Sequence, residues 1–227
     1  GESYLESITH FWRVYAGITP QAGDACEEFL SSIIDVERYP LVRLASTTAS
    51  ETAKLMENTY RAVNIAFIDE WTKFAEAAGI DLYEVIDAIR VRPTHSNIRF
   101  PGIGVGGYCL TKDPAFTPAA AKQILNYQEL EFPFSHLALQ VNQAMPLHAA
   151  AKLSKLLGGD VHDKKILLLG ISYRQDIGDT RFSPAEKFAQ ALLNAGAKVK
   201  AFDPFLDEWP EMDLQLFAHL PSPASFD

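Results

Sequence analysis

The alternation of hydrophobic and polar positions predicts a helical middle flanked by segments with short β-type runs. Between residues 56 and 78, apolar side chains recur at steps of three and four, which predicts one long amphipathic helix. A capping box at residues 48–51 would begin this helix, and Gly79 would end it. The stripe fits either an intrachain core or a dimer built on the helix. Its members are Met56, Tyr60, Val63, Phe67, Trp71, Phe74 and Ala78.

Further helices are predicted on both sides of a loop that is rich in glycine and proline. The loop covers residues 93–113, and the helices follow the same apolar periodicity and the positions of proline and glycine. One helix precedes the loop and two follow it, the last ending at a glycine pair. The three predicted ranges are 81–90, 114–126 and 133–157.

The two ends of the chain have the pattern of α/β domains. Residues 13–18 and 41–45 predict short strands around a helix at 20–31, too little to close a sheet, so we expect the remnant of a domain. Near the other end, a strand, a helix and a strand predict the opening of a parallel, doubly wound sheet that is incomplete. Their ranges are 165–169, 183–194 and 198–202.

The predicted fold class is therefore α/β multidomain. It combines a mostly helical central domain, a long connecting helix, an incomplete Rossmann-like parallel domain at the C-terminus and a remnant of an N-terminal α/β domain. The predicted boundaries are 1–46 for the remnant, 47–132 for the central domain, 133–159 for the connecting helix and 160–227 for the C-terminal domain.

Composition excludes several classes of protein. The 227 residues are 48% hydrophobic with a net charge of −9, which argues against a general binder of nucleic-acid backbones. No signal peptide or run of roughly 20 apolar residues occurs. Two cysteines predict a reducing, cytoplasmic location rather than a disulfide scaffold. The six histidines lack zinc-type spacing, so we expect no metal site.

The segment FPGIGVGGYCLTKDP, residues 100–114, is the strongest candidate for chemistry. Its glycines lead to Cys109, and Lys112 is a nearby cation that would favour the thiolate. Asp113 lies four residues after the cysteine, so one helical turn would place both on one face. The structural alternative is a buried cysteine beside a flexible loop. Gly102, Gly104 and Gly107 also satisfy G-x-G-x-x-G, but no hydrophobic strand precedes them, and we reject a dinucleotide fingerprint here.

Two further groups of polar residues are candidates. Lys54, Asn58 and Arg61 follow one face of the long helix, where they either donate to a developing oxyanion or simply face solvent. The loop GISYRQDIGDTRFSP, residues 170–184, places Arg174 and Arg181 at the carboxyl end of a parallel strand, a site suited to phosphate. Asp203 ends the next strand, where it fits either a ribose contact or an Asp-Pro turn.

Three segments in order carry a resemblance to a known family. They are SETAKLMENTYRAVNIAFIDE at 50–70, the cysteine segment at 101–114, and residues 170–184 followed by AFDP. Together they resemble the UDP-glucose/GDP-mannose dehydrogenase family over about residues 13–210. The resemblance implies NAD-dependent oxidation of the C6 alcohol of a nucleotide-linked hexose to a carboxylate, with two hydride transfers per sugar. It also implies a role in polysaccharide biosynthesis.

The resemblance implies specific roles for residues. Cys109 would form a thiohemiacetal and then a thioester, Lys54 and Asn58 would stabilise oxyanions, and Asp113 would assist water and proton transfers. Lys112 and Arg181 would contact the cofactor NAD. The substrate-binding residues would be Arg92, Arg99, Phe100, Gly102, Gly106, Tyr108 and Arg174.

Some features depart from the family pattern. Arg174 and Gln175 stand where the family commonly has lysine and a second basic residue. The family's amino-terminal Rossmann domain is missing from this sequence, and we therefore expect no turnover by this part alone. PGIGVGG resembles members that act on N-acetylhexosamines and YCLTKD those that act on UDP-glucose, so the substrate is expected to be a UDP-sugar.

Two other functions stay open. The chain could be a nucleotide-binding or dimerisation module without chemistry, in which the long helix pairs two subunits. It could also be a two-electron dehydrogenase of the hydroxyacid class, which uses a lysine and no catalytic cysteine. The expected partners are a nucleotide sugar and a second copy of the chain, with no nucleic acid and no membrane.

Overall fold

One long helix, α3 (Thr47–Ala78), contains the point at which the chain divides into two units. The computed structural model describes residues 4–227, and the chain divides between Asn58 and Thr59. Each unit is described by itself. Among residues 4–227, no helix is both long enough and apolar enough to cross a membrane.

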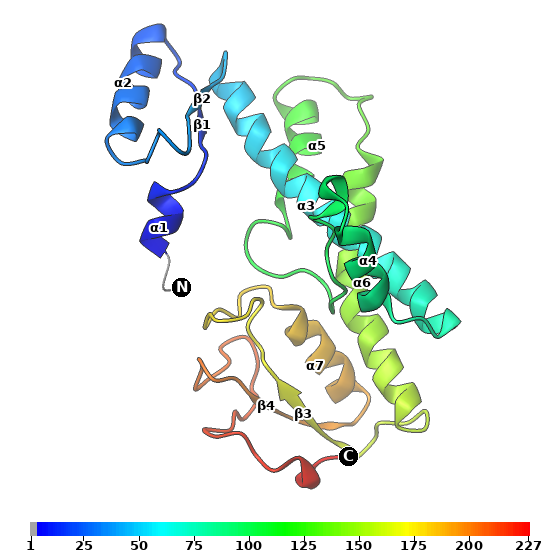
Figure 1. Cartoon of the computed structure of the whole chain (residues 1–227). Helices are drawn as coiled ribbons and strands as arrows, with labels where there is room; N and C mark the ends of the chain where they lie inside the picture. Colours follow the sequence, from blue (N-terminus) through cyan, green and yellow to red (C-terminus); the bar gives the residue numbers. More distant parts are fainter. Residues whose placement is uncertain (1–3) are drawn as a thin grey trace. The chain divides into compact units, whose positions relative to one another are not determined.

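The first unit contains a small β-α-β arrangement. After α1 (Tyr4–Thr9), strand β1 (Val14–Tyr15) pairs in parallel with β2 (Val42–Arg43), and α2 (Pro20–Ser31) connects them (Figure 1). The hydroxyl of Thr19 caps α2 by accepting from the Ala22 amide at 3.1 Å. This confirms the predicted helix at 20–31 and places both strands within their predicted ranges.

Helix α3 (Thr47–Ala78) begins one residue before the predicted capping box. Ser46, not Thr48, caps it, because the Ser46 hydroxyl accepts from the Ala49 amide at 3.1 Å. At the other end Gly79 adopts a φ of 70°, which stops the helix where the sequence predicts. The capping residue was therefore predicted wrongly, and the helix was predicted correctly.

The remaining helices of the central segment are close to their predicted positions. They are α4 (Leu82–Arg90), the single 3-10 turn η1 (Pro93–His95), α5 (Asp113–Gln123) and α6 (Pro133–Leu156). Helix α5 ends three residues before the predicted residue 126, and Asn126 has a φ of 59°, a left-handed conformation that a helix does not contain. The predicted stop of α6 at the glycine pair is confirmed.

A parallel β-α-β unit follows α6. Strands β3 (Lys165–Leu169) and β4 (Lys198–Phe202) pair in parallel with Ile166 opposite Val199, and α7 (Pro184–Asn194) crosses between them. Leu216 adds an isolated parallel bridge to Ala201, and the turn η2 (Pro223–Ser225) lies near the end of the chain. The core of this region is formed by alternate strand residues and one face of α7. Its fully or almost fully buried members include Ile166, Leu168, Ile171, Ala189, Leu192, Val199 and Ala201.

Helix α3 buries a different face from the one that the apolar stripe occupies. Its buried residues beyond the unit boundary are mostly small or aliphatic, and the aromatic residues of the stripe are exposed. An intrachain core therefore does not account for the stripe within the described chain. The exposed stripe residues are Met56, Tyr60, Phe67, Trp71 and Phe74, and the buried ones on the other faces are Ala62, Ala66, Ile68, Asp69 and Ala75.

Polar contacts join α3 to α6 within the second unit. The side-chain amide of Asn142 donates to the carbonyl of Ala62 at 3.1 Å. Further along both helices, Glu76 accepts from Lys152 at 2.6 Å and contacts the His148 ring nitrogen at 2.8 Å. Since residue numbers rise together along both helices, α3 and α6 run in the same direction (Figure 1).

Pro146 interrupts the hydrogen bonding of α6. The glycine loop, residues 102–107, approaches α6 at this point. Proline has no N–H, so the Asn142 carbonyl has no i+4 donor in its own helix. Gly104, with a φ of 122°, lies beside this carbonyl, and a Cβ added there would be 2.8 Å from the Asn142 oxygen. The loop that precedes Cys109 is therefore held close to α6 by backbone approach.

Asp69 is an ionisable group in the interior of the second unit. It is 1% exposed, and neither carboxylate oxygen has a hydrogen-bond partner among the described residues. Burial raises its pKa to about 7, while the charge of Lys73 acts in the opposite direction. The folded protein therefore favours the protonated carboxyl below about pH 7.

This burial predicts a pH-dependent stability. Folding raises the pKa of Asp69. The contribution of this residue to the free energy of unfolding is therefore fully present below about pH 4 and is lost as the pH rises towards and through 7. We expect Asp69→Asn to raise the melting temperature at pH 8 and to lose this advantage as the pH approaches 4. Thermal unfolding across this range measures the effect. Glu70→Gln, an exposed neighbour, is the control, and an equal change there would contradict the prediction.

Candidate active site around Cys109

Cys109 lies at the point where the glycine loop turns into helix α5. Cys109 is exposed, and its carbonyl accepts from the amides of Lys112 at 3.1 Å and Asp113 at 2.9 Å. Two residues earlier, Gly107 has a φ of 81°, and its carbonyl accepts from the Thr111 hydroxyl at 2.8 Å. The thiol is therefore presented to solvent from a backbone turn that is hydrogen-bonded on both sides. The alternative of a buried structural cysteine is wrong.

The acid and the cation that follow the cysteine pair with each other. Asp113 is the first residue of α5 and is 7% exposed, and Lys112 donates to its carboxylate at 3.0 Å. The Lys112 ammonium also lies 5.0 Å from the centre of the Tyr108 ring and 4.5 Å from that of Phe116. A charge held by one carboxylate and two rings is oriented beside the cysteine turn. The roles of Lys112 and Asp113 towards cofactor and water stay predictions.

The glycine loop packs directly on the β3–α7 loop, residues 170–183. The Gly107 amide donates to the carbonyl of Arg181 at 3.2 Å, and the ring of Tyr108 meets that of Phe182 edge to face at 5.6 Å. A Cβ on Gly106 would be 2.5 Å from the Cβ of Tyr173. Sequence reasoning singled out the arginines of this loop and missed Tyr173. Its position beside Arg174 carried no separate signal.

Asp203, at the end of β4, fixes the start of the β3–α7 loop through hydrogen bonds. Its Oδ2 accepts from the amides of Ile171 at 3.0 Å and Ser172 at 3.2 Å, and its Oδ1 accepts from the Phe205 amide at 3.0 Å. Burial acts to raise the pKa of Asp203, yet these hydrogen bonds hold it below the ordinary value. The carboxylate is thus engaged by the backbone of its own domain, as in a turn.

The two arginines of the β3–α7 loop differ in their surroundings. Arg181 makes a bidentate contact with Asp179, at 2.9 and 2.7 Å, and these hydrogen bonds lower the pKa of Asp179. Its side chain stays 64% exposed. Arg174 lies in the exposed part of the loop. Both cations lie in the loop at the carboxyl end of β3, where an anion would meet them. An anion at Arg181 would also lie close to the Asp179 carboxylate.

Lys54 and Asn58 belong to the first unit and lie one turn apart on α3. Lys54 is 60% exposed and is 3.9 Å from Glu57, whereas Asn58 is 1% exposed. A uniformly solvated polar face therefore does not describe this pair. Their predicted part in stabilising an oxyanion stays a prediction.

The residues predicted to line the sugar pocket are distributed over several surroundings. Phe100 stacks on Tyr83 at 5.4 Å between ring centres and carries the Arg90 guanidinium at 4.7 Å from its ring. Gly102 lines an open hollow with Tyr83, and Arg99 is exposed. Gly106 and Tyr108 contact the β3–α7 loop as described above. The structure brings the last two to the cysteine turn and places Phe100 against α4.

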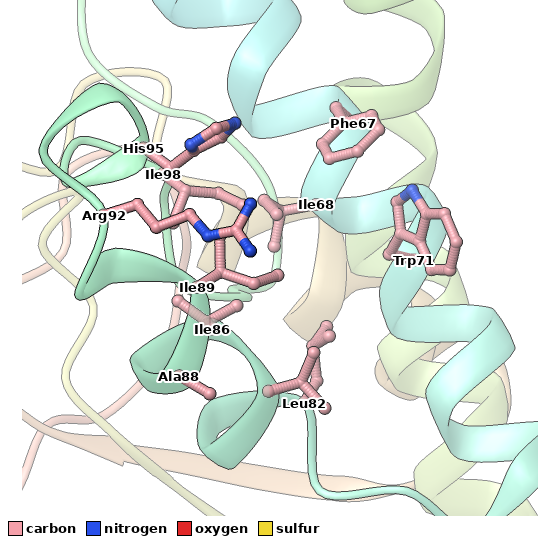
Figure 2. A pocket seen from close by; sticks show the side chains of 11 residues that line it. Phe67, Ile68, Trp71, Leu82, Ile86, Ala88, Ile89, Arg92, His95 and Ile98 are labelled. Carbon is pink, nitrogen blue, oxygen red and sulfur yellow. The ribbon is translucent and has the colours of Figure 1, made fainter.

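Arg92 lines a mostly apolar groove of about 570 Å³ in the second unit. Figure 2 shows that its guanidinium lies among side chains from α3, α4 and the turn that follows. The exposed aromatic residues Phe67 and Trp71 form one wall, so this groove continues the exposed stripe of α3. The other lining residues are Ile68, Leu82, Val85, Ile86, Ala88, Ile89, His95 and Ile98. Among residues 4–227, no cluster of three His, Cys, Asp or Glu residues could hold a metal ion.

The contacts of Asp203 predict a loss of stability on substitution. Asp203→Ala leaves three backbone amides without their acceptor, and we expect it to lower the free energy of unfolding by roughly 2–4 kcal/mol. Because the folded pKa is depressed, the contribution is present above about pH 4 and disappears as the pH falls further. Urea unfolding at pH 7 and pH 3 measures it, with exposed Asp207→Ala as the control. Equal losses at both pH values would contradict this account.

Two family models match the chain. Residues 48–144 match the UDP-glucose/GDP-mannose dehydrogenase family, central domain, and residues 167–225 match the UDP binding domain of the same family. These two matches include the cysteine turn and the β3–α7 loop, respectively.

Individual relatives agree with these matches. The chain is 33% identical over 203 residues to a UDP-N-acetyl-D-mannosamine dehydrogenase of Methanocaldococcus jannaschii, covering 89% of the chain and 44% of the relative. The enzyme of the same name from Pyrococcus horikoshii is 34% identical over 205 residues, with 89% and 46% covered. A crystal structure of NDP-N-acetyl-D-galactosaminuronic acid dehydrogenase from Methanosarcina mazei Go1 superposes with a TM-score of 0.81 at 29% identity, covering 96% of the chain and 47% of that structure. The chain spans about half the length of these relatives.

Proposed function

Because the chain belongs to the UDP-glucose/GDP-mannose dehydrogenase family, we propose that it carries the cysteine and the nucleotide-binding half of an NAD-dependent nucleotide-sugar 6-dehydrogenase. The observation that carries this proposal is the exposed Cys109 on a hydrogen-bonded turn, packed against the loop at the carboxyl end of β3. That edge of a parallel sheet is where α/β domains bind ligands. In this proposal the Cys109 thiol therefore lies next to the β3–α7 loop, which would bind the nucleotide.

In this proposal Cys109 supports the second of two oxidations. Its sulfur adds to the C6 aldehyde, forming a C–S bond, and the carbonyl oxygen takes the proton to give a thiohemiacetal. Loss of a hydride and the hydroxyl proton gives a thioester. Water then attacks the thioester carbon, the C–S bond breaks, and the sulfur leaves as the thiol with a sugar carboxylate as product. NAD, when bound, accepts one hydride in each oxidation.

The neighbours of Cys109 have parts in this scheme. Asp113, anchored at the start of α5, would assist the attack of water, and its contact with Lys112 orients it. Lys54 and Asn58 would donate to the oxyanions. Arg181 fits one end of the cofactor, since its exposed guanidinium keeps donors beyond those that Asp179 occupies, and Arg174 would hold the nucleotide. The glycines at 102–107 do not form a dinucleotide cradle, because Gly104 packs against α6.

The substrate is proposed to be a UDP-sugar. The matched C-terminal domain is a UDP binding domain, and the two archaeal relatives are UDP-N-acetyl-D-mannosamine dehydrogenases. An N-acetylhexosamine linked to UDP is therefore the first candidate, which agrees with the PGIGVGG segment.

The stoichiometry of NADH formation tests the proposal. With the complete gene product and a panel of UDP- and GDP-hexoses, we expect about two NADH per sugar consumed, because the alcohol is oxidised by four electrons. Cys109→Ala should abolish or stall the reaction, whereas Cys26→Ala, in the first unit, should keep it. One NADH per sugar with an active Cys109→Ala variant would favour a two-electron dehydrogenase. No NADH from a folded protein that binds UDP would favour a binding module.

We further propose a homodimer through α3. The exposed stripe shares Phe67 and Trp71 with the adjoining apolar groove (Figure 2), and in a monomer these apolar side chains would stay in contact with water. A second copy presents the same surface, and a two-fold axis would bring the two stripes together.

The dimer proposal predicts a change of mass on substitution of Trp71. We expect Trp71→Glu to shift the complete gene product from dimer to monomer at micromolar concentration, because the charge would be buried in an apolar interface. Light scattering coupled to size exclusion measures the mass. Phe134→Glu, at an exposed aromatic residue of α6, should leave the mass unchanged. A dimer that survives Trp71→Glu at all concentrations would place the interface elsewhere.

A further inference from the structure

Two consecutive glycines of the cysteine loop have no room for a side chain because one aromatic residue lies against them. A Cβ on Gly106 would be 2.5 Å from the Tyr173 Cβ, 2.7 Å from the Phe182 carbonyl oxygen and 2.9 Å from the Pro184 ring. A Cβ on Gly107 would be 2.7 Å from Cε2 of Tyr173. Real Cβ atoms do not approach so closely, and most of these neighbours are backbone or rigid ring atoms. The loop backbone therefore rests on Tyr173.

Tyr173 is itself held in place from several directions. Its amide donates to the carbonyl of Asp179 at 3.0 Å, which closes the β3–α7 loop. The two residues before it are bound through their amides to the buried carboxylate of Asp203. After the loop, the Ser183 hydroxyl caps α7 through the Ala185 amide at 3.2 Å. The backbone that carries the Tyr173 ring is thus hydrogen-bonded on both sides.

The position of the Gly106–Gly107 backbone determines that of Cys109, because only one residue separates Gly107 from the cysteine. Gly107 is bound at its amide by Arg181 and at its carbonyl by Thr111, and Cys109 is two residues away. Beyond the cysteine, the Asp113 amide fixes the Cys109 carbonyl to the start of α5. Both ends of the cysteine turn are anchored, so a shift of Gly107 moves the thiol.

We propose that Tyr173 is a positioning residue for Cys109. Its Cβ lies against Gly106 and its ring against Gly107, and this side chain holds the loop backbone and so places the thiol for attack on the aldehyde. This rests on the proposed function for its chemical consequence. An attacking atom misplaced by about 1 Å costs up to roughly 100-fold in rate. The contact with Gly107 is made by ring carbons, so the phenol hydroxyl is not needed.

Steady-state kinetics of the complete gene product with the UDP-sugar that it oxidises test this role. Tyr173→Phe keeps the ring and should behave as the wild type. Tyr173→Leu should lower kcat by about tenfold or more with little change in KM, because the nucleotide still binds while the sulfur is misplaced. Gly106→Ala, which pushes the loop away from the Tyr173 Cβ and the Phe182 carbonyl, should have the same effect. Tyr127→Leu, at an exposed tyrosine after α5, is the matched control and should keep its activity.

Alkylation of the two cysteines gives a readout that does not depend on turnover. With iodoacetamide and peptide mass spectrometry, Tyr173→Leu and Gly106→Ala should change the rate at Cys109 relative to Cys26, and Tyr173→Phe should not. An unchanged ratio of rates together with wild-type kcat in Tyr173→Leu would overturn the proposal. So would a loss confined to KM, which would make Tyr173 a substrate contact only. If the wild type oxidises no sugar, the proposed function fails, while the ratio of alkylation rates still decides the positioning.

Discussion

Close backbone approach at Gly106 and Gly107 is the constraint on which the candidate site depends. The glycine loop with its turn into α5 and the β3–α7 loop belong to different stretches of sequence, and they meet where these two residues have no side chain. A contact of this kind needs a rigid surface on each side. Asp203 provides rigidity under the β3–α7 loop, and the first turn of α5 provides it after Cys109. The turn that carries Cys109 is thereby tied to the region that matches a UDP binding domain.

Helix α3 serves two purposes with two faces. Small residues such as Ala62 and Ala66 are buried, and beside them the helix makes the polar contacts to α6, while aromatic residues such as Phe67 and Trp71 face outward. Asp69 is the exception on the buried side, since it places a carboxyl in the interior without a hydrogen-bond partner among the described residues. The cost of ionising it is a physical reason to expect the packing of this region to weaken towards alkaline pH.

The elements themselves could be predicted well from local signals. Proline in the first turn and a following glycine pair set the limits of α6. A continuous apolar run identified β3, and the alternating segment KVKAF identified β4. The start of α3 was less predictable because Ser46 and Thr48 are both capping residues, and only the backbone geometry decides between them. Cys109 and Asp113 could be found from the glycine-rich segment and the resemblance. Tyr173 could not, because its importance lies in a contact with residues more than 60 positions earlier. The exposure of the α3 stripe could not be predicted either, because apolar periodicity does not tell whether a stripe packs within the chain or faces outward.

The two anchor points of the glycine loop also limit how its length can vary. Gly104 lies against the Asn142 carbonyl of α6, which Pro146 leaves without a helical donor, and Gly106 lies against Tyr173. One residue, Val105, spans the two anchors. An insertion at position 105 would add about 3.5 Å of chain between two anchors that one residue already joins. The length of the loop is therefore constrained at this point, and a change in the number of residues here would move the thiol relative to α6.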